Sequence, residues 1–195
     1  MQPLPELVNG LEVLKPFLSK YGFHLDNYEN SPGCGGQVTV ATFTKGNKKF
    51  IVGYRYSVGY VIYQCGESEV THDFYLDGLG FADQKQFPDF QSDDKLLAFR
   101  HILHDLELLI EDFFLGNCPK LKLFAIQQKE LNEENHRKAV EGYKYQSDKL
   151  HINQARLEYK NKNYKKCLDY YSELQDGEFL SDFDRNIIEY CRKHE

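Results

Sequence analysis

Hydrophobic residues recur along the chain with two different periods, and the change of period separates helices from strands. Between residues 4 and 20, leucine and valine side chains stand three or four positions apart, which predicts a first amphipathic helix. The segments QVTVATF, KKFIVGYRY and VGYVIYQC are rich in β-branched and aromatic residues and predict three antiparallel strands. Gly46 and Asn47 tolerate positive φ values and predict a tight hairpin between the first two. YGFHLDNYE and ESEV can each add a strand, so we expect a sheet of about four to five strands.

A strongly amphipathic helix is predicted over residues 93–114. Its segment FRHILHDLELLIEDFF places its large apolar side chains within one arc when successive residues are set about 100° apart. Ser92 is the expected N-cap, followed by aspartates that favour the positive end of the helix dipole. The pattern buries Leu106 at the centre of the arc and leaves Glu107 and Glu111 in water.

The last part of the chain has a helical pattern with thin apolar support. Residues 120–145 predict one long helix, or two helices separated near NEENH. Residues 150–175 resemble one helical hairpin of the tetratricopeptide type, and FDRNIIEYCRKH predicts the next helix. The small and aromatic positions of that motif are held by Ala155, Tyr164, Cys167 and Tyr171. Lys162 stands where the motif usually has glycine, and one repeat is fewer than a free-standing solenoid needs.

Together these patterns predict an α+β fold in which an antiparallel sheet packs against helices and an all-α tetratricopeptide-like region follows. We expect an α+β domain over residues 1–116 and a helical region over residues 117–195. With 41% hydrophobic residues, 14 Phe and 14 Tyr, the chain can bury a sizeable core. Its five cysteines are far apart and odd in number, which favours free thiols over a disulfide framework or a zinc site.

The chain is predicted to stay away from membranes and nucleic acid. No apolar run approaches the roughly 18 residues that a membrane span needs, and the start lacks the pattern of a signal peptide, so we expect a cytoplasmic protein. A net charge of −6 argues against general binding to phosphate backbones. Residues 1–115 hold 9 Lys and Arg against 16 Asp and Glu, a field that can steer a basic protein partner. The basic cluster KNKNYKK (160–166) is interpreted as a turn between helices.

Candidate chemistry is concentrated on the polar side of the 93–114 helix. His101, His104 and Asp105 are near neighbours on a helix, and an imidazole beside a carboxylate can exchange a proton or bind zinc. Asp112, one further helical step along, is a possible member of the group. The histidines lie on different flanks and lack the H-E-x-x-H spacing, so a solvated polar face is the favoured interpretation. We expect no cofactor, and we assign no residue of this segment as a metal ligand.

A further histidine, His72, stands just after Thr71, the expected N-cap of a short helix in THDFYLDGLG. It is adjacent in sequence to Asp73, but neighbours on a helix diverge, so these two side chains do not form a dyad. We therefore expect a role near the helix cap, and keep His72 as an additional candidate for the acid–base group.

Two other stretches suggest binding. Tyr54, Arg55 and Tyr56 are candidates for contact with a partner, because aromatic residues on a sheet face can stack on a ligand. Regular alternation would place Tyr60 on the same face as Tyr54 and Tyr56, and packing beneath helices is the favoured explanation for these rings. The glycine-rich SPGCGGQ precedes a strand, unlike a phosphate-binding loop, so Cys34 is expected in a plain loop.

The order of KGNKKFIVGYRYSVGYVIYQCGESEVTHDFYLDGLG, FPDFQSDDKLLAFRHILHDLELLIEDFFLGN and the tetratricopeptide-like tail resembles a group of uncharacterised bacterial α+β proteins. Small acidic proteins of this type also resemble immunity proteins that neutralise bacterial toxins. These resemblances imply a non-enzymatic protein–protein interaction module, an immunity factor or an adaptor, with a protein partner. The alternative is a metal-dependent or acid–base hydrolase that uses the polar face of the 93–114 helix.

Overall fold

The computed structural model of the chain describes residues 2–33, 36–88 and 94–195. Its internal contacts divide it into unit 1, Met1–Glu130, and unit 2, Leu131–Glu195, and each unit has a core of its own. The predicted α+β class is confirmed, because a five-stranded antiparallel sheet is combined with helices.

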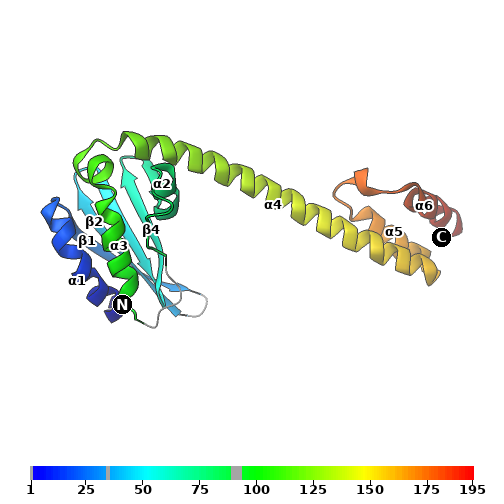
Figure 1. Ribbon diagram of the computed structural model, residues 1–195. Coiled ribbons are helices and arrows are strands. Elements are labelled where there is room, and N and C mark those ends of the chain that lie inside the picture. The colour runs from blue at the N-terminus through cyan, green and yellow to red at the C-terminus, as the bar shows by residue number, and fades with distance from the viewer. Residues whose placement is uncertain (1, 34–35, 89–93) are drawn as a thin grey trace. The chain divides into compact units, whose positions relative to one another are not determined.

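Unit 1 is an antiparallel meander with helices on one face (Figure 1). The strands pair in their order along the chain, β1-β2-β3-β4-β5, and the predicted hairpin is closed at Gly46, which has a φ of 58°. The predicted strands and the short helix after Thr71 are thereby confirmed. The elements are α1 (Pro5–Lys20), β1 (His24–Gly33), β2 (Gly36–Lys45), β3 (Lys48–Tyr54), β4 (Val58–Cys65), β5 (Ser68–Thr71), α2 (His72–Gly78), α3 (Leu97–Glu107) and the π-helix η1 (Ile110–Leu115).

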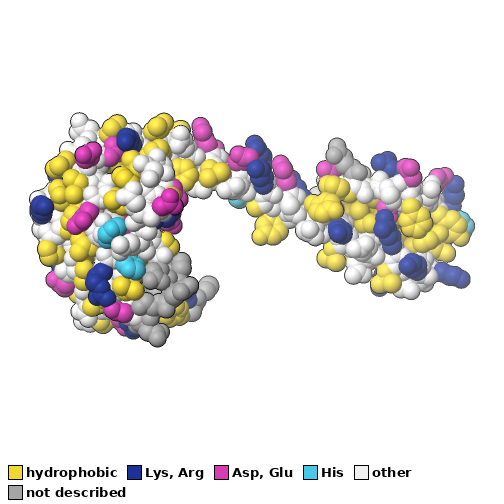
Figure 2. Space-filling view, in the orientation of Figure 1, with side chains coloured by type: hydrophobic (Ala, Val, Ile, Leu, Met, Phe, Trp, Pro, Cys, Tyr) yellow, Lys and Arg dark blue, Asp and Glu magenta, His cyan; other side chains and the backbone are white. Residues whose placement is uncertain are grey.

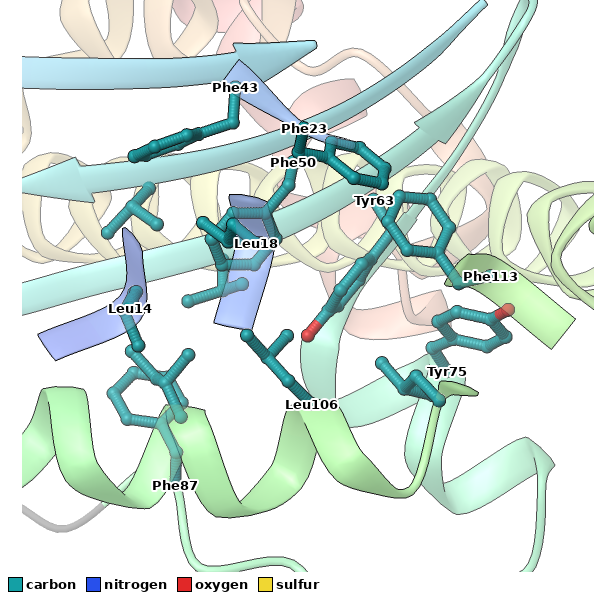
Figure 3. Close-up of a cluster of buried hydrophobic side chains, with 14 of the residues drawn as sticks. Leu14, Leu18, Phe23, Phe43, Phe50, Tyr63, Tyr75, Phe87, Leu106 and Phe113 are labelled. Carbon is teal, nitrogen blue, oxygen red and sulfur yellow. The ribbon is translucent and has the colours of Figure 1, made fainter. Parts of the chain in front are cut away.

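The core of unit 1 fills the space between the sheet and helices α1, α3 and η1. Leucines at helical spacing make one face of α1, and aromatic side chains of β2, β3 and β4 meet them from the sheet (Figure 3). Tyr63 contacts Phe50, Tyr75 and Phe113 at ring-centroid distances of 5.0 to 5.5 Å. Edge-to-face contacts of this kind add to the apolar burial that stabilises the fold.

The helix predicted over 93–114 is broken into two parts. α3 ends at Glu107, and after Leu108 and Leu109 the chain continues as the π-helix η1. Phe113 and Phe114 of η1 are both fully buried in the core. The predicted N-cap Ser92 lies outside the described residues. The apolar side of the helix faces the core as predicted, because Leu106 is fully buried while Glu107 and Glu111 are exposed.

Helix α4 (Pro119–Lys160) is one continuous helix through NEENH, which settles the alternative left open by the pattern. Its first turns pack on the core of unit 1 through Leu121 and Phe124, and Gln128 hydrogen-bonds with Thr71. This packing explains why unit 1 extends to Glu130, whereas the predicted boundary at residues 116 and 117 follows the change of pattern along the sequence.

Unit 2 is a helical hairpin followed by a third helix. The end of α4 packs against α5 (Tyr164–Ser172) and α6 (Asp182–His194), with the short 3-10 helix η2 (Gly177–Phe179) between them. Three residues of the predicted hairpin motif are buried here, namely Ala155, Cys167 and Tyr171. The carboxylate of Asp184 joins the three helices, because it accepts hydrogen bonds from Arg156 (2.7 Å to each oxygen) and from the Tyr171 hydroxyl (2.8 Å). These contacts fix α6 on the hairpin.

Within the described residues, no helix combines the length and the apolar character that crossing a membrane requires. The four described cysteines, Cys65, Cys118, Cys167 and Cys191, are free, as predicted, and all four are buried. Cys34 lies outside the described residues. Burial raises the pKa of Cys118 and of Cys167 to about 12, so both thiols are held protonated at neutral pH.

Candidate functional site

The predicted acid–base candidates meet at Asp105, but inside the protein. The Asp105 carboxylate is fully buried, although the helix pattern placed it on the polar face, and that part of the prediction is wrong. One carboxylate oxygen accepts from His104 Nδ1 (3.0 Å) and the backbone N–H of Gln86 (2.8 Å). The other accepts from His72 Nε2 (3.0 Å) and the backbone N–H of Phe87 (2.9 Å). The segment at Gln86 and Phe87 therefore covers the end of Asp105 and supplies two of its four donors.

His72 carries this network from α3 to the sheet. Its Nδ1 lies 2.8 Å from the hydroxyl of Tyr63 on β4, and Tyr63 and His72 are both buried. An ionised carboxylate only accepts hydrogen bonds, so Nε2 of a neutral His72 carries the proton toward Asp105. Nδ1 is then the acceptor, and the Tyr63 hydroxyl donates to it. The result is a continuous Tyr63–His72–Asp105–His104 network that joins β4, α2 and α3.

The environment fixes the protonation of two members of this network, Asp105 and Tyr63. Burial by itself raises the pKa of Asp105, but hydrogen bonds from His72, His104 and two backbone N–H groups outweigh it and lower the pKa. Burial, together with the negative charge of Asp105, holds the pKa of Tyr63 well above its usual value. At neutral pH the network therefore contains an aspartate anion and a neutral phenol.

The structure brings together three of the four predicted acid–base residues, His72, His104 and Asp105. His101 is not part of this group, because its Nδ1 is buried without a hydrogen-bond partner among the described residues. Asp112 belongs to a separate group in which it accepts from the Tyr75 hydroxyl (2.5 Å) and from the backbone N–H of Leu121 (3.1 Å) at the start of α4. Helical spacing alone does not show that Asp105 and Asp112 belong to two separate hydrogen-bonded groups.

Access decides what the network can do. Tyr63, His72 and Asp105 have at most 3% of their surface exposed, and only His104, at 40%, meets solvent. In residues 2–33, 36–88 and 94–195, no group of three or more His, Cys, Asp or Glu side chains is placed to hold a metal ion. Because its central members are buried and hydrogen-bonded to one another, the arrangement acts as a buried polar clamp that fixes α2 and α3 on the sheet.

The predicted contact residues Tyr54, Arg55 and Tyr56 lie on different sides of the chain. Tyr54 is buried, stacks on Phe99 at a centroid distance of 6.2 Å and donates a hydrogen bond to the carbonyl of Tyr56. Tyr56 is 71% exposed, and the Arg55 guanidinium lies 5.0 Å from the centre of its ring. A shift of register after Gly53 breaks the alternation, so packing beneath helices explains Tyr54 but not Tyr56.

The sheet face that points away from the helices is unusually apolar. We call it the open face and define it by five outward side chains of β2, β3 and β4, which are Val38, Val40, Ile51, Tyr60 and Ile62. None of these five belongs to the core, whereas Phe50 and Val52 on either side of Ile51, and Val61 and Tyr63 on either side of Ile62, do. Ile51 pairs directly with Ile62 across β3 and β4, and the Tyr60 ring lies over Gly53, where a Cβ atom would come within 2.2 Å of it.

A polar rim borders the open face. Outward positions further along the same three strands and on the neighbouring β1 and β5 hold Glu29, Thr42, Lys49, Gln64 and Glu69. An apolar centre with a polar border is the usual anatomy of a protein–protein interface. Antiparallel sheets that leave one face in water normally alternate apolar and polar residues along each strand, and here the central strands do not.

The sequence contained a signal for this face that the strand prediction did not use. FIV in β3 and YVIY in β4 are uninterrupted apolar runs, and such runs are typical of strands that are covered on both faces. Tyr63 was also missed as a network member, because its strand pattern says only that it is aromatic and turned inward. Its partner His72 comes from the next helix, and the pairing depends on the fold.

Comparisons with known proteins give the chain no relative. Neither a protein-family model, nor a curated protein, nor a solved structure matches it. The resemblances to uncharacterised bacterial α+β proteins, to toxin-immunity proteins and to tetratricopeptide repeats therefore stay predictions.

Proposed function

We propose that this chain is a non-enzymatic protein–protein interaction module whose unit 1 docks a partner on the open face. The observation that carries the proposal is that β3 and β4 are apolar on both faces while the described helices cover only one. Burying partly exposed valine, isoleucine and tyrosine side chains provides the favourable free energy that drives association. An immunity factor and an adaptor both act in this way, by covering the surface of another protein.

The charge of unit 1 indicates the kind of partner. Residues 1–130 hold 12 Lys and Arg against 17 Asp and Glu, a net charge of −5, and Glu29 and Glu69 stand on the rim of the open face. The partner we propose has an apolar patch bordered by basic side chains, since opposite charges speed association and select among partners. Tyr56 and Arg55 at one end of the strands are of the residue types that most often dominate binding energy.

The acid–base alternative is less well supported by the geometry. Its three assembled residues form a clamp in which every oxygen of Asp105 is engaged by protein donors, and only His104 can touch a solute. We therefore assign Tyr63, His72 and Asp105 to stability and not to chemistry.

Site-specific photo-crosslinking in native cells tests the proposal. A benzophenone amino acid is placed at Ile62 on the open face and, as a control from which no product is expected, at the exposed Glu107 of α3 on the helix-covered side of the sheet. We expect Ile62 to trap one basic protein, and the added Val40→Lys substitution to abolish that product by placing a charge in the apolar centre. The Val40→Lys variant must unfold at the same temperature as the wild type, so that loss of the product reports on the open face and not on the fold. A product that survives Val40→Lys, or the absence of any product at Ile62, would contradict the proposal.

A further inference from the structure

Unit 2 carries a concentration of positive charge on the turn between α4 and α5. Lys160, Lys162, Lys165 and Lys166 fall within seven residues and are all exposed. None of these four side chains forms an ion pair with another described residue. We call this set the basic turn. It contrasts with unit 2 as a whole, where residues 131–195 hold 12 Lys and Arg against 13 Asp and Glu.

Two acidic side chains flank the basic turn in sequence, and neither forms an ion pair with its lysines. Glu158 accepts a hydrogen bond of 2.6 Å from Asn163 inside the turn, and Asp169 follows one helical turn after Lys165 on α5. Because four lysines stand against these two carboxylates, residues 158–169 carry a net charge of +2. Figure 2 shows Lys and Arg side chains next to hydrophobic ones over the surface of unit 2.

Aromatic rings and backbone contacts make the base of this surface rigid. Tyr190 of α6 lies 5.7 Å from both Tyr159 and Tyr164, measured between ring centroids, and stacks on His194 at 4.0 Å. Lys162 holds a φ of 61°, and backbone hydrogen bonds within the turn fix its path. A depression of the surface is lined by Asn163, Tyr164, Lys165 and Lys166. The lysines are thus presented from a well-ordered frame.

We infer that the basic turn is a docking surface for an acidic protein segment, a run of Asp and Glu side chains. Charge complementarity carries the inference, because four unpaired ammonium groups on a fixed turn match a series of carboxylates. Each exposed pair contributes little by itself, so affinity requires several lysines acting together. The surface is in unit 2 and uses none of the residues of the open face, so this inference is independent of the proposed function.

The aromatic rings favour an acidic peptide over a single-stranded nucleic acid. Binding of single strands depends on open aromatic faces on which successive bases stack. Here Tyr190 is stacked on His194 with an interplanar angle of 13°, and Tyr159 presents its ring to Tyr190 at 88°. These rings contact one another in place of a ligand, and the lysines remain as the binding groups.

The experiment measures binding of the full chain to a fluorescein-labelled peptide of ten glutamates by fluorescence anisotropy. A triple variant with Lys162, Lys165 and Lys166→Gln is compared with a control triple variant with Lys138, Lys144 and Lys149→Gln. The control lysines are exposed on α4 in the same unit, so both variants change the net charge equally. We expect the control to bind like the wild type and the first variant to bind about tenfold more weakly.

A second readout locates the contact. Carbodiimide joins carboxylates to amines without a spacer, and we expect the cross-linked peptide to map to residues 160–166. Equal weakening of both triple variants would show a general charge effect and overturn the inference, as would no binding by the wild type. Tighter binding of an oligothymidine of equal charge, lost in the first triple variant, would also overturn it by identifying a nucleic-acid surface.

Discussion

His72 Nε2 lies 3.0 Å from Asp105 Oδ2 in the interior of unit 1, where both side chains are almost completely buried. Asp105→Ala removes the acceptor of four hydrogen bonds and leaves two backbone N–H groups and Nε2 of His72 without a partner. Each buried donor that loses its acceptor costs about 1–3 kcal/mol of unfolding free energy. Hydrogen exchange of the β3 and β4 amides in the full chain measures the loss within unit 1.

His101→Ala is the matched control for this variant, since His101 is on the same helix but outside the network. We expect it to change stability by no more than about 1 kcal/mol, the typical size of an ordinary substitution. Equal losses in the two variants would show that Asp105 has no special role in joining α2, α3 and the sheet.

The same carboxylate predicts how stability changes with pH. Because the folded state lowers the pKa of Asp105, the stabilisation is complete above its unfolded value of about 3.9 and is lost as the pH falls through the folded pKa. We expect the wild type to be more stable than Asp105→Asn at pH 7, and the gap to narrow below about pH 4. Denaturant unfolding at a series of pH values tests this, and a gap that is constant down to pH 2 would contradict it.

The elements of unit 1 could be predicted because their signals are local. The leucines of α1, the β-branched strands and the glycine of the β2–β3 turn each specify a backbone conformation within a few residues. The hairpin of unit 2 follows from the same kind of pattern. The facing of α3 was also predictable, because Leu106 is the centre of an apolar arc.

The position of Asp105 could not be predicted, since it depends on parts of the chain that are distant in sequence. Periodicity places it on the polar side of α3, and the segment at Gln86 and Phe87 buries it there. Tyr60 shows the same limit, because a register shift after Gly53 places it opposite Gly53 on the open face and not on the face of Tyr54. Helix periodicity and strand alternation assume regular elements, and both residues lie where long-range packing changes the outcome.

Lys48 and Lys49 are neighbours on β3 with opposite surroundings. Lys48 is buried and donates hydrogen bonds to the carbonyls of Phe113 (2.6 Å) and Gly116 (2.5 Å) at the end of η1, where a cation complements the helix dipole. Lys48→Met leaves these carbonyls without their donor and should cost about 1–3 kcal/mol. Lys49→Met, on the exposed side, should change stability by no more than about 0.5 kcal/mol. Denaturant melts compare the two, and a larger loss for Lys49→Met would refute the assignment.

Two helical glycines have opposite roles. Gly10 lets α1 approach α3, because a Cβ atom there would lie 2.1 Å from the buried Phe99 ring. Gly10→Ala should therefore destabilise unit 1 by about 1–3 kcal/mol through overpacking. Gly142 of α4 has nothing within 4 Å of an added Cβ atom, so Gly142→Ala should stabilise the helix by about 1 kcal/mol through its better helix propensity. Hydrogen exchange of the α1 amides in Gly10→Ala and of the α4 amides in Gly142→Ala measures the expected loss and the expected gain of stability separately. Stabilisation by Gly10→Ala would show that α1 and α3 do not pack closely at this point.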